Sequence, residues 1–176
     1  MAHSMVLIPV PEADFVVRPR LERFAPEHLP VDPDDTAAHI TLLAPFTVIG
    51  AAERGLVSEL RELFADVVQF PFRLTEISRF PGGTTYLSPE PAGPFRQLTH
   101  ELMKLLPEFP PYGGAFEDIV PHLSVPVLDG EDPDTLRREL GSRFPISAHA
   151  REAALFWREP GASRTLETFS FGTTAA

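Results

Sequence analysis

His39-Ile40-Thr41-Leu42 and His122-Leu123-Ser124-Val125 are one four-residue pattern written twice: a histidine, an apolar residue, a hydroxyl residue and an apolar residue. Alternate residues of a β-strand share a face, so the histidine and the hydroxyl of each pattern point to one side and the apolar residues to the other. Each pattern therefore predicts a strand with an apolar core face and a polar face. If the two polar faces meet, they bring two proton carriers and two hydroxyl donors to one ligand.

The sequence around these motifs predicts alternating strands and helices. Residues 51–67, for example, place Val57, Leu60 and Phe64 at helical spacing, and Asp132-Pro133 is typical of a helix start. Strands are predicted at 5–10, 38–43, 70–78, 84–87, 119–127, 146–157 and 164–171, and helices at 14–25, 51–67, 93–106 and 133–143.

Both halves of this prediction follow the order strand, helix, motif strand, helix, strand. A chain of 176 residues suits one domain or two small lobes that share a core. We therefore predict an α+β fold with two duplicated αβ lobes, related by a pseudo-twofold axis and separated by a central groove. Residues 1–4 resemble an expression remnant, so the single bilobal domain is placed at 5–176.

Composition restricts the partners. The chain carries 15 basic and 25 acidic residues, a net charge of −10, and no run of basic residues. Long nucleic acids bind mainly through clustered Lys and Arg, so a nucleotide ligand is expected to be small or to be only an RNA end. Cysteine is absent, which excludes disulfides and thiolate metal sites. No apolar run approaches the ~20 residues of a membrane span, so a cytoplasmic protein without membrane contact is expected.

The chain resembles the 2H phosphoesterase superfamily, in particular its 2'-5' RNA ligase-like family. The resemblance rests on the two histidine motifs and extends to three neighbouring stretches, which are 42–46, 80–87 and 112–122. It implies a bilobal α+β fold with two antiparallel sheets lining a groove. It also implies metal-free chemistry, without a cofactor, on cyclic or 2'-linked phosphodiesters of nucleotides and RNA ends.

The four motif side chains fit such a reaction. Hydrolysis of a 2',3'-cyclic phosphate needs a base for the attacking water and an acid for the leaving alkoxide, and histidine suits both roles near neutral pH. Thr41 and Ser124 would donate hydrogen bonds to the nonbridging oxygens, where charge grows in the transition state. We take His122 as base and His39 as acid for hydrolysis. The reverse assignment is equally consistent with the sequence.

Four further residues are candidates for substrate binding. Arg79 and Arg158 would supply positive charge near a phosphate, Tyr86 would stack on a base, and Phe46 would wall the groove. Each also has an ordinary interpretation, as a surface arginine, a hairpin aromatic or a core residue. A monomer is expected.

Other functions remain open at this point. A metal site could use His39 and His122 with Asp118 or Asp129, but the chain lacks clustered His ligands and that site would leave both hydroxyls unexplained. A non-catalytic module that binds nucleotides or RNA ends would need the same groove without turnover. An interaction protein that kept only the fold is the third alternative.

Overall fold

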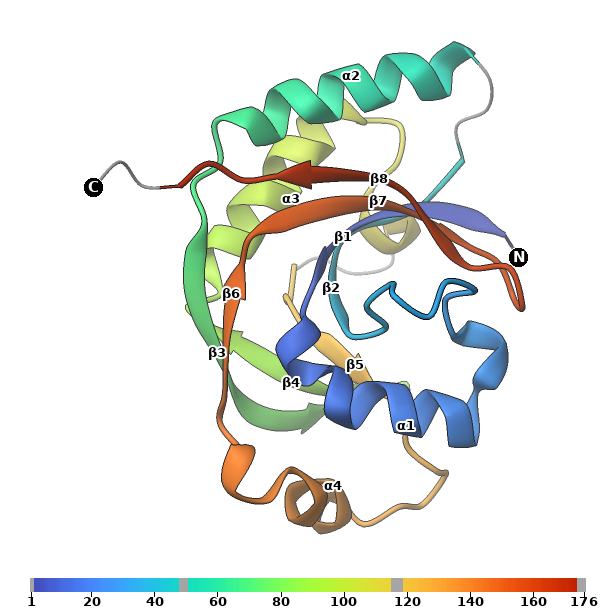
Figure 1. The fold of residues 1–176 in the computed structure, drawn as a ribbon, viewed down its shortest axis with the longest axis vertical. Coiled ribbons are helices and arrows are strands. Elements are labelled where there is room, and N and C mark those ends of the chain that lie inside the picture. Colours follow the sequence, from blue (N-terminus) through green and yellow to red (C-terminus); the bar gives the residue numbers. More distant parts are fainter. Residues whose placement is uncertain (1, 48–50, 115–118, 174–176) are drawn as a thin grey trace.

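The computed structural model describes residues 2–47, 51–114 and 119–173, which form strands and α-helices in alternation (Figure 1). The strands are β1 (His3–Pro9), β2 (His39–Phe46), β3 (Phe70–Arg79), β4 (Thr85–Glu90), β5 (Leu123–Val125), β6 (Ile146–Ala150), β7 (Glu152–Arg158) and β8 (Arg164–Ser170). The α-helices are α1 (Asp14–Phe24), α2 (Ala51–Ala65), α3 (Gly93–Leu105) and α4 (Pro133–Leu140).

The strands form one antiparallel sheet in the order β6-β3-β4-β5-β2-β1-β7-β8. The sheet is strongly curled, like half of a barrel (Figure 1). The motif strands β2 and β5 are neighbours in its middle, with three strands on either side. The mixed α and β character is therefore confirmed. The ladder is continuous across β5 and β2, however, so two separate sheets are not observed and the pseudo-twofold duplication stays a prediction.

Two strand predictions differ from the structure for identifiable reasons. The predicted strand 119–127 is reduced to Leu123–Val125, because Pro121 and Pro126 flank it and proline cannot donate a ladder hydrogen bond. The predicted strand 146–157 is two strands separated at Arg151, since β6 pairs with β3 whereas β7 pairs with β1. β1 already begins at His3, which pairs with Arg158, although whether residues 1–4 are an expression remnant stays a prediction.

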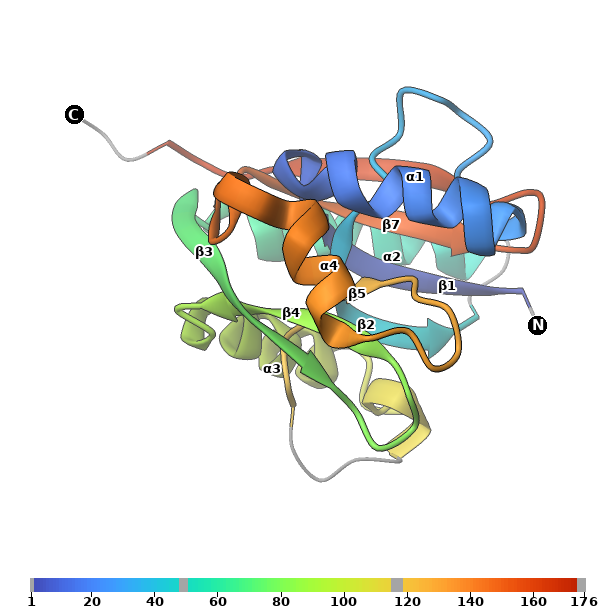
Figure 2. The same ribbon diagram turned by 90° about the horizontal axis from the view of Figure 1, so that it is seen from below.

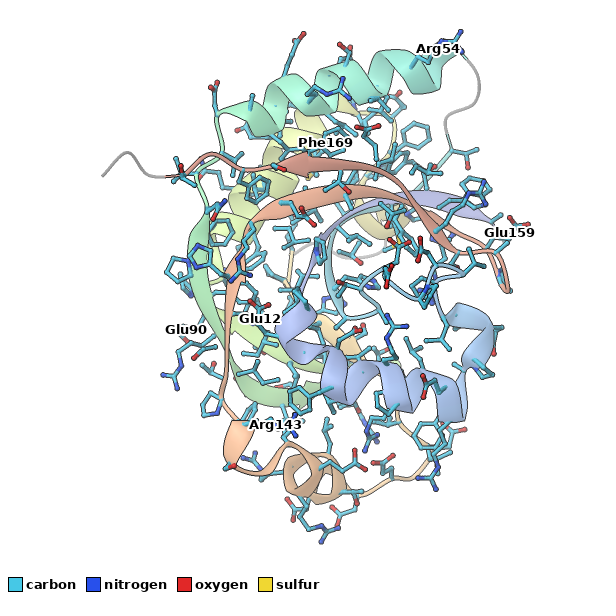
Figure 3. All side chains as sticks on the ribbon, viewed as in Figure 1. Glu12, Arg54, Glu90, Arg143, Glu159 and Phe169 are labelled. Atoms are coloured by element: carbon cyan, nitrogen blue, oxygen red, sulfur yellow. The ribbon has the colours of Figure 1, made fainter. Side chains whose placement is uncertain are left out.

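The helices cover the curled sheet from different sides. α1 and α4 lie side by side in both views and are joined by Arg20 and Glu139 (Figures 1 and 2). α2 packs on β8, which carries Phe169 (Figure 3), and α3 packs on β2. The ring centroids of Phe169 and Phe64 are 5.5 Å apart. The main apolar core includes the inward side chains of all four helices.

A second, smaller apolar cluster lies apart from this core. Its members come from three adjacent strands, β1, β2 and β7: Met5, Leu7, Ala44, Ala154 and Phe156. Leu7 is directly opposite Thr41 in the ladder, and the ring of Phe156 lies 6.4 Å from that of His39. This second apolar cluster therefore borders the polar faces of the motif strands.

Candidate functional site

A cavity of about 1010 Å³ lies over the polar faces of β2 and β5. All four motif side chains line it, together with Phe46 and Arg158. The other lining residues are Ala2, His3, Met5, Val17, Leu21, Ala25, His28, Ala37, Ala44, Pro45, Thr47, Gly82, Gly83, Thr84, Thr85, Phe109, Val125, Pro126, Val127 and Asp129. The structure thus brings together the residues that the two motifs predict.

The pairing of the motif strands sets their geometry. Ile40 and Leu123 are partners in the antiparallel β2–β5 ladder. This register puts His39 across from Ser124 and Thr41 across from His122, all on the face opposite the core. Diagonal neighbours such as His39 and His122 are typically about 7–8 Å apart at Cβ. A tetrahedral phosphate fits between two side chains at that spacing.

His39 has a defined tautomer and a strongly perturbed pKa. Its Nδ1 lies 2.8 Å from the carbonyl oxygen of Ala37. Because a carbonyl only accepts, Nδ1 carries the hydrogen and Nε2 holds the lone pair. Burial and, to a smaller extent, the charges of Arg158 and His122 together lower the pKa of His39 to about 4, against the opposing effects of the Ala37 hydrogen bond and the charge of Asp14. His39 is therefore neutral at neutral pH.

His122 has the same tautomer in a less enclosed setting. Its Nδ1 donates to the carbonyl of Val120 at 2.7 Å, which again makes Nε2 the basic nitrogen. Phe80 and Tyr86 present their rings edge-on to the imidazole, with centroids 4.9 and 5.5 Å away. Burial lowers the pKa of His122, and the hydrogen bond to Val120 opposes this effect.

A carboxylate that the sequence analysis missed supports the first motif. Oδ1 of Asp14, at the start of α1, accepts the N–H groups of Ala37 at 2.9 Å and Ala38 at 2.7 Å. Its Oδ2 accepts from Nε of Arg18 at 2.9 Å. Asp14 therefore fixes the peptide whose carbonyl orients His39. Nothing in the local sequence indicates this contact, because it joins residues more than twenty positions apart.

A buried arginine holds the segment that follows the second motif. Nη1 of Arg20 donates to the carbonyl of Pro126 at 2.9 Å, Nη2 to Oε1 of Glu131 at 2.7 Å and Nε to Oε2 of Glu139 at 2.8 Å. The sequence does contain a pattern from which this buried arginine could have been predicted. Arg20 follows Val16 and Val17 at helical spacing, so it lies on the apolar face of α1, where a cation needs partners.

Two of the four predicted substrate-binding residues line the cavity and two do not. Phe46 is buried in the cavity wall, 6.0 Å from the ring of Phe109, and Arg158 also lines the cavity. Arg79 donates from Nε to Oγ1 of Thr85 at 3.0 Å, and Tyr86 stacks on Phe80 at 4.1 Å. Neither Arg79 nor Tyr86 is among the lining residues. The substrate contacts of all four stay predictions.

Within the described residues, no three His, Asp or Glu side chains are grouped as metal ligands would be. Asp129 lies at the cavity wall, whereas Asp118 lies outside the described part of the chain. The described helices include none that is long and apolar enough to cross a membrane.

Comparisons with known proteins agree with this geometry. Solved structures match over nearly the full chain, among them TT0787 of Thermus thermophilus, with a TM-score of 0.66 and 20% identity over 98% of this chain and 100% of that one. LigT of E. coli in its apo form matches with a TM-score of 0.62 and 18% identity over 96% of each chain. A search of curated proteins finds no match.

At these identities the solved structures establish the fold. The family follows from the sequence itself, because the model of the 2'-5' RNA ligase superfamily matches residues 11–162, which include both histidine motifs. The chain therefore belongs to the 2'-5' RNA ligase superfamily of 2H phosphoesterases.

Proposed function

We propose that the protein is a metal-independent phosphodiesterase, which hydrolyses a cyclic or 2'-linked phosphodiester of a small nucleotide or RNA end, of the 2',3'-cyclic phosphate type. The observation that carries this proposal is the β2–β5 pairing, which places two histidines and two hydroxyls on one wall of one cavity. Structures of LigT with 3'-AMP, NADP+ and ATP support a small nucleotide as ligand.

Burial favours one assignment of the acid and the base. The free protein holds His39 as the more strongly neutral imidazole, because its pKa is lowered to about 4. A bound anionic phosphodiester favours the protonated form of an adjacent histidine, and His122, which is less enclosed, takes up that proton more readily. We therefore assign His39 as the base that activates water and His122 as the acid that protonates the leaving oxygen. This assignment reverses the one first taken from the sequence.

Thr41 and Ser124 complete the site as hydrogen-bond donors. The β2–β5 register sets each hydroxyl across from the histidine of the other motif, so a phosphate between the imidazoles has a donor on either side. Donors fixed by a sheet need no reorganisation as charge develops on the nonbridging oxygens. In-line displacement then moves the proton of water to His39 and a proton from His122 to the alkoxide.

The first experiment measures hydrolysis of 2',3'-cyclic nucleotides in EDTA by the wild type, His39→Ala and His122→Ala, with exposed His100→Ala as control. Wild-type turnover should resist EDTA, and each motif variant should lose roughly 10²–10⁴-fold in kcat. Full activity in either motif variant would exclude the two-histidine mechanism. Ligand binding without turnover in the wild type would instead favour a non-catalytic nucleotide or RNA-end binding module.

A second experiment separates the acid from the base. A 2'-deoxynucleoside 3'-(p-nitrophenyl phosphate) lacks an internal 2'-hydroxyl nucleophile, so water must attack its phosphorus. Its p-nitrophenolate leaving group departs without protonation. If His122 is the acid, His122→Ala should recover most of its lost activity on this ester, whereas His39→Ala should not. Recovery confined to His39→Ala would restore the opposite assignment.

A further inference from the structure

One end of the cavity carries charge that the two motifs do not use. Arg158 is the single Lys or Arg among the lining residues of the described chain, and Asp129 is the single carboxylate. His28 lies at the same end, since the charge of Arg158 lowers its pKa. In a protein with a net charge of −10, Arg158 brings a positive charge to this wall. Such a reversal of charge in a cavity attracts an anion.

Arg158 lacks a partner within the described residues. Its guanidinium makes no hydrogen bond or ion pair there, although Glu27 is near enough to favour the charged form. Burial lowers the pKa of Arg158, which means that the protein holds a partly desolvated cation without neutralising it. A buried guanidinium is normally paired with a carboxylate or a phosphate, so the arrangement is complete only with an anion present.

His28 has one ring nitrogen without a partner in the described part of the chain and is held in place by its backbone. Its Nδ1 is buried without a hydrogen-bond partner, and its Nε2 lies 3.7 Å from Oε1 of Glu27. The short helical turn Pro26–His28 is fixed to the β7–β8 hairpin, which carries Glu159 in Figure 3. Gly161 N donates to the carbonyl of Glu27 at 2.7 Å. His28 is thus built into the wall beside Arg158 by the backbone.

This end is distinct from the space between the motif strands. Arg158 pairs with His3 at one end of β1, and His39 pairs with Pro9 at the other end. About 20 Å of strand separates these positions, which exceeds the reach of an arginine side chain. The charge of Arg158 nevertheless acts on His39, whose pKa it lowers.

We propose that Arg158 and His28 form a second anion subsite, which binds a phosphate that the substrate carries in addition to its reacting phosphodiester. The proposal rests on the function proposed above and narrows the substrate to a nucleotide with a separate phosphate or diphosphate group. Arg158 contributes two donors in a fixed fork, and His28 contributes a further donor when the anion is bound.

The test compares adenosine 2',3'-cyclic phosphate with the same compound carrying a 5'-phosphate. The wild type should favour the 5'-phosphorylated substrate in kcat/KM by about 10- to 100-fold, the range expected for charge-assisted hydrogen bonds. In Arg158→Met and His28→Ala this ratio should fall toward one. The ratio is unaffected by any change in the pKa of His39, because both substrates undergo the same chemistry. Arg164→Met, an exposed arginine across from Trp157 on the same hairpin, is the matched control and should keep the wild-type ratio.

Binding of ADP, which has no cyclic phosphodiester, tests the subsite without turnover. Calorimetry should show that Arg158→Met weakens ADP binding by about 10-fold or more, while His122→Ala keeps it. If neither cyclic substrate turns over but Arg158→Met still weakens ADP binding, the subsite stands and the proposed function fails. If the wild-type ratio is near one and Arg158→Met slows both substrates equally, the subsite is overturned and Arg158 serves the reacting phosphate.

Discussion

His39 and His122 each donate Nδ1–H to the carbonyl of the residue two positions earlier, Ala37 and Val120. The same local contact thus sets the same tautomer at both motifs, with Nε2 as the nitrogen available for proton transfer. The two imidazoles differ in what surrounds them. His39 is enclosed by the sheet and near Arg158, whereas His122 lies against the rings of Phe80 and Tyr86.

The depressed pKa of His39 predicts a loss of stability in acid. The unfolded chain binds a proton near the ordinary value of 6.5, whereas the folded protein binds it only near 4, so stability is full above the first pH and falls toward the second. The difference corresponds to roughly 3 kcal/mol below pH 4. Urea unfolding across this range should show a smaller acid loss in His39→Gln than in the wild type. An exposed-histidine variant, His100→Gln, should behave as the wild type, and equal acid loss in all three proteins would contradict the prediction.

The motif hydroxyls should act on the transition state rather than on binding. Replacing Thr41 with Val or Ser124 with Ala removes one donor to the phosphate and leaves the strand intact. We expect kcat to fall roughly 10²-fold for each with little change in KM, because the donors act where charge develops. Ser147→Ala, an exposed serine on β6, provides the control. A rise in KM at constant kcat would assign the hydroxyls to ground-state binding instead.

At the scale of the elements, the site depends on how short strands are held in place. β5 spans only Leu123–Val125, and the segment that follows it has few ladder contacts. Arg20 compensates by joining α1 to Pro126, Glu131 and α4. Asp14 has the corresponding role before β2, where it accepts the N–H groups of Ala37 and Ala38.

Removing the Arg20 side chain should therefore weaken both the fold and the second motif. Arg20→Met leaves Glu131 without its main partner, and we expect a loss of about 2–3 kcal/mol of unfolding free energy at neutral pH. Arg20 lowers the pKa of Glu131, so this contribution disappears in the wild type as the pH falls through that pKa. Urea unfolding of Arg20→Met and of the exposed control Arg138→Met measures the effect. Equal stability of the two variants at neutral pH would show that the Arg20 contacts contribute nothing.

The elements also show how far the sequence predicts this fold. Apolar periodicity predicted α2, α3 and most strands, because it reports which face is buried, and the Asp132-Pro133 helix start predicted α4. Alternation within the motifs placed the histidines and hydroxyls on one face, as the cavity lining confirms. The long-range pairing order was not predictable in this way, since β3 also pairs with β6, which lies far along the chain. Arg20, Asp14 and His28 act through contacts between distant segments, and a local pattern carries little information about those.

On the scale of the whole molecule, the distribution of charge favours small anionic substrates over long ones. The chain is strongly acidic, yet the cavity over the motif strands contains one arginine, four histidines and a single carboxylate among the described lining residues. A small anion that enters the cavity meets the positive charge of Arg158. A longer polyanion must also pass over the acidic surface, which repels each added phosphate.

This contrast predicts that activity decreases with substrate length. In a series of oligoribonucleotides ending in a 2',3'-cyclic phosphate, kcat/KM should fall with each added nucleotide at about 0.01 M salt, where the Debye length is ~30 Å. At about 0.15 M salt, with a Debye length of ~8 Å, the longer members should recover much of the loss. Activity that rises with length at low salt would mean that the protein binds the RNA backbone, as expected for a true RNA-processing enzyme. The mononucleotide serves as the internal control, because its rate should depend least on salt.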